Sequence, residues 1–101
     1  MKLHILVVGR NPQIMETVLR LINAQENWEA FGALTDEDGW QLIQQHPMDL
    51  VLIGGGVDEH SEQFFSTACE EINPAIRVIR HYGGGSGLLF TEIKEAMNLK
   101  N

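Results

Sequence analysis

The sequence holds few cysteines, few cations and no long apolar run, and each shortage excludes a class of protein. The single cysteine, Cys69, rules out an internal disulfide and fits a reducing compartment. Seven Lys and Arg against fourteen Asp and Glu give a formal net charge of −7, which disfavours binding to nucleic acid or to an anionic membrane. No apolar run approaches the ~20 residues of a membrane helix, and no signal-peptide pattern is present. We therefore expect a soluble, cytoplasmic protein.

The length and the hydrophobic content of the chain are typical of one globular domain. The chain has 101 residues, of which 44% are hydrophobic, so we expect a single domain over residues 1–101 with a packed core. Its four histidines show no spacing with Cys69 that is typical of a metal site, and Cys69 lies on an apolar helical face. We expect Cys69 in the core and no metal or other cofactor.

The stretch Met48–Val57 organises the rest of the chain. Leu50–Ile53 is apolar without polar alternation, which is typical of a strand buried on both faces of a parallel sheet. Three glycines, Gly54–Gly56, follow it directly. They mark the carboxyl end of the strand, which is where open α/β sheets bind their ligands.

The remaining elements alternate about that strand. Further strands are predicted at 3–8, 28–34 and 75–82, and helices at 12–25, 36–46, 58–72 and 88–99. Asn11 and Thr35 are suited to cap the first two helices, and the third helix is predicted to begin at Asp58. The acidic run 36–38 is interpreted as a helix start. Helical spacing assigns these apolar side chains, among others, to the core: Ile14, Phe64, Phe65 and Ile72. The short connections require right-handed parallel crossovers, so the fold class is α/β.

Three stretches carry a resemblance to a known family. They are Ile5–Pro12, Glu37–Ile43 and His46–Ile53, which are similar in order and spacing to the first strand, second helix and third strand of response-regulator receiver domains. The resemblance implies a flavodoxin-like three-layer αβα sandwich with a four-stranded parallel sheet in the order 2-1-3-4. It also implies a role in two-component signal transduction. We expect no enzyme activity, because the sequence shows no acid–base or nucleophile constellation.

The residues that carry the family's chemistry are different here. Receivers bind Mg²⁺ through acidic residues after the first strand, where this chain has Gly9 and Arg10, and their phosphoacceptor aspartate is replaced by Gly54. The Ser or Thr that ends the family's fourth strand corresponds to His81 or Tyr82. The family's fifth strand is missing. The resemblance therefore implies a truncated pseudo-receiver whose degenerate phosphorylation pocket holds no metal.

A second glycine-rich loop, 83–87, lies between the last strand and the last helix, without a Walker motif and without the dinucleotide-binding glycine pattern. Backbone amides of the two glycine loops, together with an arginine, can form an anion pocket. Its contacts would be Arg10, Gly54, Gly55, Gly84, Gly85 and Ser86. The competing interpretation is that the glycines only form turns and that Arg10 lies in solvent or pairs with Asp58 or Glu59.

Two functions follow from these patterns. The first is a non-phosphorylatable, receiver-like regulatory module that acts through contact with a signalling protein. The second is a sensor for a small anion or nucleotide at the glycine loops. Because the fourth strand is predicted at a sheet edge, either the last helix covers that edge or a second copy pairs with it in a homodimer.

Overall fold

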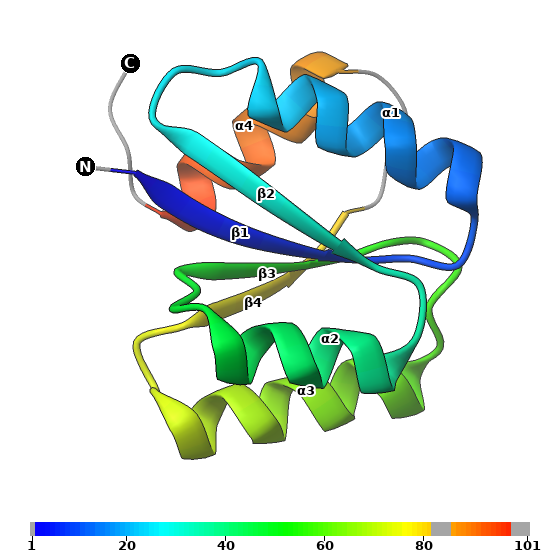
Figure 1. Cartoon of the computed structure of the whole chain (residues 1–101), viewed down its shortest axis with the longest axis vertical. Helices are drawn as coiled ribbons and strands as arrows, with labels where there is room; N and C mark the ends of the chain where they lie inside the picture. The colour runs from blue at the N-terminus through cyan, green and yellow to red at the C-terminus, as the bar shows by residue number, and fades with distance from the viewer. Residues whose placement is uncertain (1, 82–85, 98–101) are drawn as a thin grey trace.

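Figure 1 shows the computed structural model of the protein, which describes residues 2–81 and 86–97. Strands and helices alternate as the sequence predicted: β1 (Leu3–Val8), α1 (Pro12–Asn23), β2 (Trp28–Ala33), α2 (Asp36–Gln45), β3 (Leu50–Ile53), α3 (Glu59–Ile72), β4 (Arg77–Arg80) and α4 (Ser86–Ala96). The four strands are parallel and lie in the order β2-β1-β3-β4. The predicted fold class and strand order are confirmed.

The two central strands are the most apolar ones, as predicted. β3 is buried along its whole length, and four of the six residues of β1 are buried. The register pairs Ile5 with Leu50 and Val8 with Ile53, so the two strands end together. Their carboxyl ends therefore present Gly9 and Gly54 at the same edge of the sheet.

Helices cover both faces of the sheet. Alternate residues of β1 and β3 point to opposite faces, as the pleat of a strand requires. Leu6, Val51 and Ile53 pack in one core cluster with Ile43 of α2 and Phe65 of α3. The strand residues that point to the other face, such as Val7 and Leu52, form a second core cluster with side chains of α1 and α4. Figure 1 shows α1 and α4 together on that side of the sheet. The three-layer arrangement is confirmed.

The first three helices begin at the residues that the sequence indicated. The Asn11 side-chain oxygen accepts hydrogen bonds from the amides of Gln13 and Ile14 at 2.9 and 3.0 Å. Thr35 accepts from the Asp38 amide at 3.1 Å, and Asp58 caps α3 in the same way. Each cap satisfies amides that the first helical turn leaves without a partner.

Three apolar residues expected in the core are exposed instead. Phe64 is 39% exposed, Ile72 45% and Ile14 62%. Neighbouring positions on a helix point about 100° apart, so only one of two adjacent apolar residues can face the sheet. Phe65 takes that position in α3 and Met15 takes it in α1, where they are 0% and 8% exposed. The assignment of Phe64, Ile72 and Ile14 to the core was wrong.

The last part of the chain also departs from the prediction. The fourth strand is shorter than 75–82, because Ile76 still bonds through its amide to the Asn73 carbonyl in the preceding turn, at 2.9 Å. Ser86, expected in the loop, is the first residue of α4. Leu89 and Ile93 of α4 are buried on the face of the sheet, so this helix does not lie along the β4 edge. None of the helices within residues 2–81 and 86–97 has the length and apolarity to cross a bilayer.

Candidate functional site

The carboxyl ends of β1 and β3 approach each other so closely that there is little room for a side chain. The Gly54 amide donates to the Val8 carbonyl at 2.7 Å. A Cβ atom added to Gly54 would lie 3.1 Å from that carbonyl oxygen and 3.6 Å from the Gly9 Cα. Gly55, one residue later, faces open space. The end of β3 is therefore backbone only, and whatever chemistry it offers comes from peptide groups.

Arg10 supplies one cation of this edge, and both Nη atoms of its guanidinium donate hydrogen bonds. Nη1 donates to the Leu34 carbonyl at 2.9 Å, and Nη2 donates to Oδ1 of Asp36 at 2.6 Å. Nη2 also donates to the Ser61 hydroxyl at 3.2 Å, and that hydroxyl donates to the other Asp36 oxygen at 2.6 Å. Arg10 therefore joins the β1–α1 loop to the start of α2 and to α3, and its charge is balanced by Asp36.

The hydrogen bonds and charges around Arg10 lower the pKa values of the two neighbouring carboxyl groups, Asp36 and Asp58. Burial raises the pKa of Asp36, but the hydrogen bond from Ser61 and the hydrogen bond and charge of Arg10 lower it by more. The net pKa of Asp36 lies below its ordinary value of 3.8. The pKa of Asp58 is lowered as well, mainly by the hydrogen bond from the Ser61 amide. Both carboxylates are charged at neutral pH.

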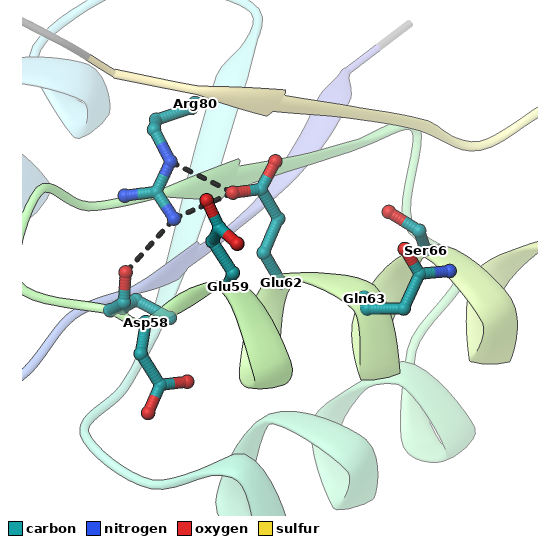
Figure 2. Close-up of a pocket in the computed structure, with 7 residues that line it drawn as sticks. Asp58, Glu59, Glu62, Gln63, Ser66 and Arg80 are labelled. Atoms are coloured by element: carbon teal, nitrogen blue, oxygen red, sulfur yellow. Dashed lines mark hydrogen bonds and ion pairs between the residues drawn. The ribbon is translucent and has the colours of Figure 1, made fainter.

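A second arginine, Arg80 at the end of β4, holds the loop between β3 and α3. Its Nε and Nη2 donate to Oε1 of Glu62 at 2.8 and 2.6 Å. Nη1 donates to the Gly54 carbonyl at 3.2 Å, and Nη2 donates to the Val57 carbonyl at 2.9 Å. Figure 2 shows this guanidinium between the loop and α3. Its side chain is only 15% exposed, so these bonds are shielded from solvent.

A shallow hollow of about 620 Å³ lies beside the Arg80 guanidinium, along α3. Its lining residues are Val57, Asp58, Glu59, Glu62, Gln63, Ser66 and Arg80 (Figure 2). Apart from Arg80 its charged groups are all acidic, and Arg80 is already bonded to Glu62. Across the described ranges, no three His, Cys, Asp or Glu side chains come together in a way that could hold a metal ion.

Comparison with solved structures identifies the fold. A receiver domain protein (CheY-like) from Methanospirillum hungatei JF-1 is 16% identical, with a TM-score of 0.78 over 97% of this chain and 95% of that chain. HP1043, an orphan response regulator of H. pylori, is 15% identical, with a TM-score of 0.74 over 94% and 96%. The signal receiver domain of an HD domain-containing protein from Pseudomonas fluorescens Pf-5 is 11% identical, with a TM-score of 0.72 over 97% and 96%. The chain has the receiver-domain fold.

Comparisons of the sequence alone found no related family or protein. A scan against protein-family models found no match, and a search of the curated proteins found none that is similar. Because these receiver structures share only 9–16% of their residues with this chain, the likeness concerns architecture. Function within the receiver fold has to be argued from the residues of this chain.

The receiver fold brings only part of the predicted site together. Gly9 and Gly54 are adjacent, and Arg10 lies beside them, but its side chain extends toward Asp36. Of the competing expectation for Arg10, the pairing with Asp58 or Glu59 was wrong: the residue is exposed, and its partner is Asp36. His81 pairs through Nδ1 with Glu92 of α4. Tyr82, Gly84 and Gly85 lie outside the described residues, and the structure describes no side chain for Ser86.

Two residues that matter at this edge were not singled out from the sequence. Ser61 is only 6% exposed and links Asp36 to Arg10. Its signal was its position three residues after Asp58, where its amide is capped. Arg80 had a signal too, because it follows the apolar pair 78–79 inside a predicted strand, and a cation there needs partners.

Cys69 lies where the sequence placed it, in the core. It is 1% exposed, and burial raises the pKa of its thiol to about 11. A thiol with that pKa is protonated at neutral pH, whereas nucleophilic cysteines need the thiolate. The position supports a packing role for Cys69.

Proposed function

We propose that the chain is a receiver-like regulatory module that accepts no phosphoryl group and acts through contact with another protein. The observation that carries this proposal is the identity of the residues at the ends of β1 and β3. These are Gly9, Arg10 and Gly54, which the resemblance aligns with the acidic residues of receivers. Forming an aspartyl phosphate needs a carboxylate nucleophile, and Mg²⁺ prefers oxygen ligands.

The contacts of this edge support the proposal further. Arg10 presents a fixed positive charge where the resemblance expects a metal-binding acid, and Asp36 and Ser61 hold it there. Two carboxylates near this edge have other roles, since Asp36 pairs with Arg10 and Asp58 caps α3. The proposal therefore assigns this edge a structural role and no catalytic one.

Exposure of the protein to acetyl phosphate and Mg²⁺, followed by intact mass spectrometry, tests the proposal. We expect the mass to stay unchanged, while a phosphorylatable receiver domain in the same buffer gains one phosphoryl group. Stoichiometric uptake that depends on Mg²⁺ would overturn the proposal, whichever residue of this chain accepts the group. Peptide mapping would then identify the acceptor, with Asp36 and Asp58 the first to inspect.

The proposal includes self-association through β4. This strand lies at one edge of the sheet, and no described strand pairs with its outer side. Unpaired strand edges are commonly covered by another chain, and two copies can pair in this way about a two-fold axis. We propose a homodimer formed by these edges, in addition to a signalling partner.

The alternative function, a sensor for an anion or nucleotide, has less support. Of its six predicted contacts, Arg10 is bonded to Asp36 and to the Leu34 carbonyl, which leaves its charge balanced. The sensor stays a prediction that ¹⁵N–¹H NMR with added phosphate, sulfate or nucleotides can test. Saturable shifts confined to residues 54–56 and 83–87 would favour it over the contact module.

A further inference from the structure

An apolar groove runs between α2 and α3, on the side of the molecule away from α1 and α4 (Figure 1). Its volume is about 450 Å³, and its lining residues are Trp40, His60, Gln63, Phe64, Thr67, Ala68 and Glu71. All but Trp40 belong to one stripe of α3 with helical spacing. From residue 60 to residue 71 that stripe is about 16 Å long, or three helical turns.

The aromatic side chains of the groove pack against the hydrophobic core beneath them. Phe65 is fully buried in the core, and its ring meets Phe64 edge-on with centroids 5.1 Å apart. Phe64 in turn meets Trp40 of α2, with centroids 6.2 Å apart and planes at 65°. Gly39 allows this, because a Cβ there would lie 2.7 Å from the Phe65 ring. The groove therefore offers a rigid aromatic surface, as docking anchors require.

The two helices that form the groove are acidic and carry no Lys or Arg, although Glu71 is the acid that lines the groove itself, beside His60. Residues 36–45 contain three Asp or Glu and residues 58–72 contain five, and neither segment contains a Lys or Arg. Asp36 and Glu62 pair with Arg10 and Arg80. In the part of the chain that the structure describes, the other acids have no Lys or Arg partner: Glu37, Asp38, Asp58, Glu59, Glu70 and Glu71.

We propose that this groove binds an amphipathic helix of a partner protein, with its apolar face on Phe64 and Trp40 and with Lys or Arg on its flanks. An apolar helix face in a hydrophobic groove is a recurring mode of peptide recognition, and the three-turn length of the stripe suits it. Glu71 in the groove and the other acids of α2 and α3 favour a basic partner by charge complementarity. A second copy of this chain, with a net charge of −7, would meet like charges here.

The inference rests on the proposed contact module, and its test is separate from the phosphorylation test. The probe is a synthetic helix-forming peptide of Leu and Lys, and the matched probe has Glu in place of each Lys. Binding is measured by anisotropy of the labelled peptide, and ¹⁵N–¹H NMR locates it on the protein. We expect the Lys peptide to bind with shifts at α2, α3 and the Trp40 indole, and the Glu peptide not to bind.

Two variants separate the apolar and the charged parts of the site. Phe64→Ala should weaken binding of the Lys peptide by about tenfold or more, since central aromatic residues dominate such interfaces. Glu71→Lys lies on the exposed rim, so the fold is kept while binding weakens and loses part of its dependence on salt. The matched control is Ile14→Ala on α1, which is more exposed than Phe64 and should leave binding unchanged.

Four results would overturn the inference. The first three are equal binding of the Glu peptide, equal weakening by Ile14→Ala and Phe64→Ala, and shifts that avoid α2 and α3. The fourth is a concentration-dependent mass that Phe64→Ala abolishes, because the occupant would then be a second copy. Uptake of phosphate in the other experiment would remove the proposed function, yet it would leave these binding results as they are.

Discussion

Arg10 joins three segments that are far apart in the sequence, and its removal tests how much that junction contributes. Arg10→Met keeps most of the aliphatic stem and loses the bonds to Leu34, Asp36 and Ser61. Both members of the ion pair are about one-third exposed, so solvent screens it. We expect a loss of about 1 kcal/mol in the free energy of unfolding at neutral pH, measured by urea denaturation. Arg20→Met on the exposed side of α1 is the control and should change stability by less than about 0.5 kcal/mol.

The same substitution has a consequence for the pH dependence of stability. The pKa of Asp36 is below its ordinary value of 3.8 in the folded protein. A carboxyl of this kind stabilises the fold above its unfolded pKa, and the contribution is lost as the pH falls through the folded pKa. In Arg10→Met we expect the pKa of Asp36 to rise toward 3.8, and ¹³C NMR titration of the carboxyl group measures this change. We also expect the variant to lose less unfolding free energy than the natural protein when the pH is lowered. An unchanged pKa would show that Ser61 alone holds the carboxylate.

Gly54 and Gly55 are neighbours with opposite surroundings, which makes them a matched pair. A methyl group at Gly54 would press on the Val8 carbonyl, 3.1 Å from the added carbon, whereas one at Gly55 meets nothing within 4 Å. Gly54→Ala should therefore lower the free energy of unfolding by about 1 kcal/mol or more. Gly55→Ala should leave it within about 0.5 kcal/mol. Equal effects in thermal or urea unfolding would contradict the close approach of β1 and β3.

The β3–α3 loop depends on β4 through Arg80. Arg80→Met removes the ion pair with Glu62 and the guanidinium donors to the Gly54 and Val57 carbonyls, of which the Gly54 carbonyl keeps the Val57 amide at 3.2 Å. We expect a loss of about 2–3 kcal/mol in unfolding free energy, together with faster hydrogen exchange at the Val57 amide. Arg77→Met, on the exposed part of the same strand, should cost less than about 0.5 kcal/mol. Similar losses in both variants would mean that Arg80 contributes only as a strand residue.

Local sequence patterns were sufficient to predict the helices and strands. The apolar runs 3–8 and 50–53 and the caps at Asn11, Thr35 and Asp58 fix the elements because their physical causes lie within a few residues. The partners of Arg10 and Arg80 depend on register and helix rotation, which no local pattern contains. The same holds for which of Phe64 and Phe65 faces the core, since both satisfy the apolar spacing.

The outward peptide groups of the two edge strands, β2 and β4, have different surroundings. Along β2 the Ala30 amide donates to the Asn23 side chain at 2.8 Å, so a side chain of α1 satisfies one peptide group of that edge. Along β4 the amides of Arg77 and His81 bond to β3, so in a parallel ladder the peptide groups of Val78 and Arg80 point outward. No described strand lies beyond them. The β4 edge therefore offers outward peptide groups to a second copy, and the proposed homodimer would form there.

Val78 allows this proposal to be tested with one position and two substitutions. Val78→Pro removes the outward amide hydrogen without removing a bond to β3, whereas Val78→Ala shortens the side chain and keeps the amide. We expect the natural protein and Val78→Ala to sediment as dimers and Val78→Pro as a monomer, with circular dichroism confirming that each variant is folded. A strictly monomeric mass for the natural protein at high concentration would contradict the dimer. A dimer that persists in Val78→Pro would place the interface elsewhere, because pairing of β4 edges needs that hydrogen.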